Sequence, residues 1–261
     1  MDNKFSMGGT STQKYLPNLD ILKFVCAIIV VFYHTANLEV YGKTSLSNLR
    51  EIIWFVGRFV SPVECFFIIS AFFLFRKLVL LENEKGSEIL KKYIFHLMVL
   101  YIIWSIPYYH YIVKNFSGRS LFHNLASLVY QYAVTGYSLQ TWYIPSLLFG
   151  IIVVQTLSER ILSLSYDFYV CICPTVYFLV RKCITGKQVT VCVKNLGKMS
   201  TIIYFSHIAI RDLILNIGQN VRNGVEFNGF VLWGLTVFFS ALLALLIIKM
   251  GAKMKLFRYL Y

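Results

Sequence analysis

The stretch from Leu19 to Thr35 constrains the fold of this chain more than any other. It is long and apolar enough to begin a membrane-spanning helix, yet it carries Lys23 near its start and His34 near its end. On an α-helix these two residues lie within about 20° of one face and about 16 Å apart along the axis. One side of the helix is therefore expected to present Lys23 at the lipid headgroups and His34 inside the bilayer. A snorkelling lysine and a packed histidine explain the same pattern equally well.

Composition indicates a membrane protein rather than a soluble one. Of the 261 residues, 57% are hydrophobic, 17% aromatic and only 14% charged. The net charge of +13 raises the question of nucleic-acid binding, but the basic residues lie between apolar runs rather than along one face. We therefore expect a lipid bilayer as the environment and no nucleic-acid partner. The N-terminal stretch shows no apolar core with a cleavage site, so no cleaved signal peptide is expected.

Eight apolar segments predict an all-α, polytopic transmembrane helical bundle without a second, soluble domain. The expected spans cover residues 19–37, 56–75, 93–113, 121–135, 142–157, 163–180, 200–217 and 228–248. We expect a polar cytoplasmic tail at residues 1–18, a transmembrane domain at 19–248 and a basic cytoplasmic tail at 249–261. Segment 121–135 is short, which leaves seven spans as the alternative.

The distribution of basic residues favours eight spans. With a cytoplasmic N-terminus and eight crossings, 17 of the 25 Lys and Arg residues lie on the cytoplasmic side. If segment 121–135 does not cross, the basic loop 181–198 and the C-terminal tail move outside, against the positive-inside rule. Both chain ends are therefore expected in the cytoplasm.

A second candidate site lies in the segment from Ser61 to Phe73. Glu64 sits near the outer end of an apolar span, and Arg58 precedes it by two turns. An acidic residue inside a membrane is a functional candidate, with Arg58 or His34 as its partner. A structural ion pair that fixes helix packing is the alternative.

Four parts of the sequence form a recognisable set: Lys23 with His34, Glu64–Phe72, Thr141–Leu147 and Gly197–His207. Together they resemble acyltransferase family 3, whose members are integral-membrane enzymes that O-acetylate cell-envelope glycans. Lys23 and His34 have the spacing of the family's motif, a basic residue followed by ten residues and a histidine. Glu64–Phe72 is similar to its acid-x-F-F-x-x-S-G-F block, and Thr141–Leu147 to its L-W-Y-L-x-A-L block. Gly197–His207 is similar to its G-x-x-S-x-x-I-Y-x-x-H block. The four blocks follow the family's order across most of the chain.

The chain departs from the family pattern at several positions. Lys23 stands where the family usually has Arg, which keeps the charge but loses the bidentate geometry. Ala71 replaces a glycine, and Lys91 and Lys92 match the family's basic pair only loosely. Family members usually have a further pair of helices before the His207 block. The resemblance thus predicts a shortened member, either a compact enzyme or an inactive one.

The resemblance implies an O-acetyltransferase that moves an acetyl group from cytoplasmic acetyl-CoA to a hydroxyl of an envelope polysaccharide or lipid-linked glycan precursor, in a bacterial-type inner membrane. His34 would be the general base, because a protonated hydroxyl is a poor nucleophile. Glu64 would orient His34 or favour its imidazolium form. Lys23, Lys91 and Lys92 would bind the CoA phosphates at the inner headgroup level.

The remaining candidates would line the acceptor pocket. Ser70 would donate a hydrogen bond to the acyl carbonyl. Trp142 fits either a sugar-stacking platform or an interfacial aromatic belt, and His207 either a polar lining residue or a packed histidine. The full set of pocket candidates is Arg58, Phe66, Phe67, Ser70, Trp142 and His207.

Other chemistries find no support in the sequence. The six cysteines include no C-x-x-C pair, and there is no glycine-rich phosphate loop or serine elbow, so we expect no metal and no bound cofactor beyond acetyl-CoA as co-substrate. Arg211 and Asp212 stand side by side in a late span and are assigned no role. The competing class is a non-enzymatic transporter or translocation subunit in which Lys23, His34 and Glu64 form a proton or solute path. The sequence gives no indication of the oligomeric state.

Overall fold

The computed structural model describes residues 16–36, 62–80, 86–110, 120–138, 140–153, 187–220 and 228–261. Every regular element in these ranges is helical, which confirms the predicted all-α class. The longer helices are α1 (Pro17–Ala36), α3 (Pro62–Leu80), α4 (Gly86–Ser105), α6 (Leu121–Tyr130), an apolar helix at Tyr143–Val153, α8 (Lys187–Asn220) and α9 (Gly229–Lys253). The short helical turns are η2 (Ile106–Tyr108), η3 (Gln131–Thr135) and η4 (Lys255–Leu260).

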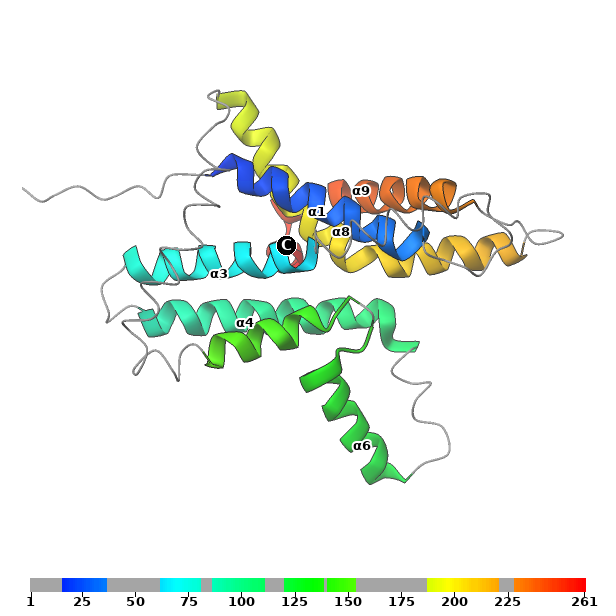
Figure 1. The fold of residues 1–261 in the computed structure, drawn as a ribbon, viewed down its shortest axis with the longest axis horizontal. Helices are drawn as coiled ribbons and strands as arrows, with labels where there is room; N and C mark the ends of the chain where they lie inside the picture. Colours follow the sequence, from blue (N-terminus) through cyan, green and yellow to red (C-terminus); the bar gives the residue numbers. More distant parts are fainter. Residues whose placement is uncertain are drawn as a thin grey trace, which may run out of the picture.

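Helices α1, α8 and α9 lie side by side and form the core of the described structure (Figure 1). Val31 of α1 and Ile203 of α8 are fully buried there. The buried face of α9 includes the small residues Thr236, Ser240 and Ala244, which recur every four residues. Small side chains at this spacing let helix backbones approach closely in a membrane.

Helices α3 and α4 lie beside this core, α3 against α1 and α4 against α3 (Figure 1). Tyr108, in the turn η2 that continues α4, fastens this layer to α8. Its hydroxyl donates to the backbone oxygen of Phe205 at 2.6 Å and accepts from the backbone N–H of Ala209 at 3.2 Å. Tyr108 is fully buried, so these two bonds satisfy a phenol that would otherwise be costly to bury. The end of α4 is thereby held next to the middle of α8.

Among the residues that the structure describes, three helices are long and apolar enough to cross a membrane, namely Pro17–Thr35, Gly86–Tyr108 and Gly229–Lys253. Shorter apolar helices at Pro62–Leu74 and Tyr143–Val153 fall within two further predicted spans. The chain is therefore a helical membrane protein. The predicted span at 163–180 lies outside the described residues, so the count of eight remains a prediction.

Helix α6 points away from the bundle (Figure 1). It exposes apolar side chains. Phe122 is 82% exposed and Val129 is 65% exposed, a surface suited to lipid rather than water. The turn after it depends on Gly136, whose φ of +74° lies in the region that favours glycine. A side chain at Gly136 would also collide with the backbone of Trp142. This turn directs the chain back toward α8.

Candidate active site

Two histidines from distant parts of the sequence meet between α1 and α8. The ring centroids of His34 and His207 lie 5.2 Å apart, with an angle of 32° between the ring planes. His34 is half-buried near the C-terminal end of α1, and His207 is fully buried in α8. The sequence singled out both residues, but nothing in it indicated that their rings face one another.

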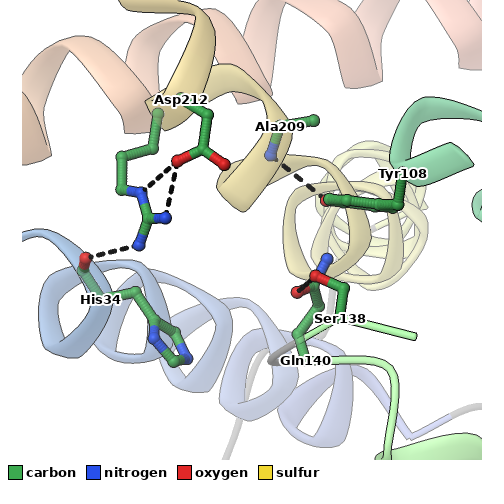
Figure 2. A network of polar contacts seen from close by, with 7 residues as sticks. His34, Tyr108, Ser138, Gln140, Ala209 and Asp212 are labelled. Atoms are coloured by element: carbon green, nitrogen blue, oxygen red, sulfur yellow. Dashed lines mark hydrogen bonds and ion pairs between the residues drawn. The ribbon is translucent and has the colours of Figure 1, made fainter. Parts of the chain in front are cut away.

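Arg211 attaches the end of α1 to α8. Its Nη1 donates to the backbone oxygen of His34 at 3.3 Å, while Nε and Nη2 donate to Oδ1 of Asp212 at 2.8 and 2.6 Å (Figure 2). The last carbonyls of a helix have no partner within the helix, and a cation there also interacts favourably with the helix dipole. Arg211 follows His207 by four residues, so both project from one face of α8. Helix α8 therefore contacts His34 at its ring and at its backbone.

The hydrogen bonds of His207 indicate which ring nitrogen carries its proton. Its Nδ1 lies 2.7 Å from the backbone oxygen of Tyr204. Because a carbonyl oxygen only accepts, Nδ1 of the neutral ring carries the hydrogen and Nε2 the lone pair. Nε2 is buried and has no hydrogen-bond partner within the described structure. An unpaired buried acceptor costs roughly 1–3 kcal/mol, which marks this atom as a candidate for function.

Aromatic and hydroxyl side chains extend this site from His207 toward α3. The ring of Tyr204 lies 6.2 Å from that of His207 and 5.7 Å from that of Tyr143. Tyr143 in turn lies 4.6 Å from Phe67, and its hydroxyl is 2.7 Å from Oγ of Ser70. The side chains of three family-like segments thus meet around Tyr143 and Tyr204.

The other two aromatic candidates flank this group. Phe66 is buried 5.2 Å from the ring of Tyr204. Trp142 lies 6.0 Å from Phe67 and is 40% exposed. Its position fits both a stacking platform and an interfacial aromatic residue, so the two readings stay open.

A polar turn that contains Ser138 and Gln140 holds Tyr204 in place. The Tyr204 hydroxyl donates to the backbone oxygen of Gln140 at 3.0 Å, and Nε2 of Gln140 donates to the backbone oxygen of Phe205 at 3.3 Å. Oγ of Ser138 donates to Oε1 of Gln140 at 2.8 Å (Figure 2). Each bond satisfies a buried polar group, and together they fix the register of this turn on α8.

Lys23 lies in a separate, largely buried cluster nearer the N-terminal end of α1. Its Nζ is 3.1 Å from Oδ1 of Asp20, with side chains 21% and 11% exposed, and 5.0 Å from the ring centroid of Phe73. The carboxylate of Asp20 packs directly against Gly197 of α8. The glycine that begins the fourth family-like segment therefore leaves room for an acidic side chain of the first.

The other candidates that the structure describes lie at exposed positions. Lys91 and Lys92 are exposed on α4, where Lys92 lies 3.8 Å from Glu88 in a solvent-exposed pair that contributes little to stability. Glu64 is exposed in the first turn of α3, and no described residue forms an ion pair with it. Arg58 lies outside the described residues. The roles expected for these four residues remain predictions.

The close contact at Gly197 leads to a test with a matched control. A methyl group at Gly197 would overlap the carboxylate of Asp20, whereas one at Gly234 of α9 would meet nothing. Gly197→Ala is therefore expected to destabilise the protein by about 1–3 kcal/mol, while Gly234→Ala leaves it unchanged or slightly more stable. Thermal unfolding of both variants in detergent measures this. Equal melting temperatures for the two variants would contradict the contact.

An apolar helical bundle that encloses histidines, tyrosines and a serine defines a membrane protein with a polar binding or reaction site in its interior. A family model described as an acyltransferase domain matches residues 16–158, more than half of the chain. The chain therefore belongs to acyltransferase family 3 and is a membrane acyltransferase. The match includes His34, Ser70 and Trp142 but ends before α8. No curated protein and no solved structure matches the chain.

Proposed function

We propose that this acyltransferase moves an acetyl group from cytoplasmic acetyl-CoA to a hydroxyl of a cell-envelope polysaccharide or a lipid-linked glycan precursor. Its location would be a bacterial-type inner membrane, with both chain ends in the cytoplasm. Family membership supports acyl transfer. The observation that carries the choice of base is the position of His34, whose backbone is held by Arg211 and whose ring faces His207.

The chemistry assigns a role to each of these groups. His34 takes the proton of the acceptor hydroxyl, while the hydroxyl oxygen forms a bond to the carbonyl carbon of the thioester. The C–S bond then breaks, and the proton passes from His34 to the departing CoA thiolate, which leaves acetyl ester and CoA thiol. In this proposal Ser70, whose Oγ lies 2.7 Å from the hydroxyl of Tyr143, donates a hydrogen bond to an acyl oxygen.

The donor is expected to bind at the Lys23 end of α1. Lys23 provides a cation close to the expected headgroup level, and Lys91 and Lys92 add two exposed cations on α4. Phosphate binding by such side chains would leave the acetyl end of CoA directed toward His34. In the same proposal the aromatic group of Phe66, Phe67 and Trp142, with Arg58, receives the acceptor.

The test is acetyl transfer by the purified protein in detergent or nanodiscs, with acetyl-CoA labelled in its acetyl group. We expect slow hydrolysis without acceptor and label incorporation when lipid-linked glycan is added. A transporter or translocation subunit would release no CoA thiol. If neither hydrolysis nor transfer occurs with acetyl-CoA or longer acyl-CoA, in preparations that remain folded, the proposed function is wrong.

A further inference from the structure

We propose that His207 is a positioning residue for His34. Its Nε2 accepts a hydrogen bond from an N–H of the His34 ring and so fixes the tautomer in which the other nitrogen of His34 faces the acceptor hydroxyl. This inference rests on the proposed function, because it assigns His207 a task in that reaction rather than a place in the pocket lining.

The separation of the two rings is that of a hydrogen-bonded pair. A ring nitrogen lies about 1.1 Å from the centroid of an imidazole, and an N–H···N bond spans about 2.9 Å, so a linear bond places two centroids about 5 Å apart. The observed centroid distance is 5.2 Å. The two rings therefore lie within reach of an N–H···N bond between α1 and α8. Such bonds in active sites commonly tighten only when substrate binds.

The hydrogen bonds around the pair leave one nitrogen of His207 for this task. Nδ1 is bonded to the backbone oxygen of Tyr204, while Nε2 is buried with its lone pair unused. Among the residues that the structure describes, no hydrogen bond reaches a ring nitrogen of His34, since Arg211 binds its backbone oxygen instead. His34 lacks the acceptor that a general base needs to orient its second nitrogen, and His207 has an acceptor without a donor.

Helix α8 keeps the two histidines in register. Arg211 lies one turn after His207 and binds the backbone of His34. The same face of α8 therefore determines where both imidazole rings lie along the helix axes. Asp212 accepts two hydrogen bonds from Arg211, which offsets the guanidinium charge beside the imidazolium that forms on His34. The proton that His34 gains can then be shared with Nε2 of His207 until the CoA thiolate takes it.

The activity test compares two variants of His207. Leucine has similar bulk but no acceptor, whereas the amide oxygen of glutamine can accept the hydrogen bond. We expect His207→Leu to lower kcat for acetyl transfer by about tenfold to a hundredfold with little change in KM for acetyl-CoA, as for other groups that orient a catalytic histidine. His207→Gln should stay within about fivefold of the wild type. His123→Leu, at an exposed position in α6, is the control. Equal kcat in the leucine variant and the wild type would overturn the proposal, as would an equal loss in both variants that remain folded.

A second measurement does not depend on activity. The measurement is NMR of wild-type protein labelled with ¹⁵N-histidine, in the presence of a non-hydrolysable acetyl-CoA analogue. We expect a single tautomer of His34 and a nitrogen–nitrogen coupling between the rings of His34 and His207. Loss of the His34 signals in His34→Ala assigns them. Two exchanging tautomers of His34 in the wild type would overturn the pairing. If acetyl transfer is absent but the coupling is found, the proposed function fails and the pairing of the two histidines stands. If transfer depends on His34 but the coupling is missing, the proposed function stands and the pairing fails.

Discussion

Replacement of His34 by alanine is expected to lower acetyl transfer by roughly 10²–10⁴-fold, the contribution that general-base catalysis typically makes. Membrane insertion and stability should remain close to those of the wild type. The reason is that Arg211 binds the backbone oxygen of His34, which alanine retains, so the attachment of α1 to α8 survives the substitution. Initial rates with labelled acetyl-CoA, together with thermal unfolding in the same detergent, measure both quantities.

The control for this prediction is a histidine outside the site. His123→Ala changes an exposed residue near the start of α6 and is expected to leave the rate unchanged. A His34→Ala protein that keeps more than about a tenth of the wild-type rate would exclude His34 as the base. A variant that loses both activity and stability would instead show that the imidazole packs the interface between α1 and α8.

The sequence allowed prediction of the helical membrane class because apolar length is a local property. Residues 228–248 form an apolar run without a charged residue, residues 19–37 are largely apolar but include Asp20, Lys23 and His34, and the structure has α9 and α1 there. Helix α8 is 34 residues long and begins well before the predicted span at 200–217. Its first part carries Lys187, Lys194 and Lys198, and such charges break the apolar pattern on which prediction of a span's bounds depends. The contact of Arg211 with α1 is likewise recorded by no local pattern.

The candidate site was predictable residue by residue but not as an arrangement. His34 and His207 stood out because ionisable residues are rare in apolar segments. Their contact depends on how α1 packs on α8, across 173 residues of chain. Arg211 was passed over, although its position four residues after His207 was a usable signal that both project from one helix face. Tyr204 was equally hard to single out, because an aromatic residue in a membrane helix is ordinary until its hydroxyl is seen to bind Gln140.

Substitution of Lys23 is expected to have the other large effect, and the structure separates its two possible causes. Lys23→Gln removes a cation from beside a largely buried carboxylate, since Asp20 lies 3.1 Å from Nζ and packs against Gly197. Breaking a buried ion pair by removal of one charge destabilises a protein by up to about 3–5 kcal/mol. Lys23→Gln should therefore lose most of its activity and some of its stability, whereas Lys23→Arg keeps the charge and should retain substantial activity.

The double variant Asp20→Asn with Lys23→Gln separates donor binding from stability. It removes both charges of the pair, so no carboxylate remains that has lost its cation, and thermal unfolding should return close to the wild-type temperature. If Lys23 binds the CoA phosphates, the double variant still lacks that cation even though its stability is restored. Its KM for acetyl-CoA should then stay at least about tenfold above the wild-type value, which corresponds to the loss of one charge-assisted contact. Asp20→Asn alone should keep a KM near that of the wild type, because it leaves the cation in place. A double variant that recovers both stability and KM would show that Lys23 serves only to neutralise Asp20 between α1 and α8, and the donor phosphates would then have to bind elsewhere.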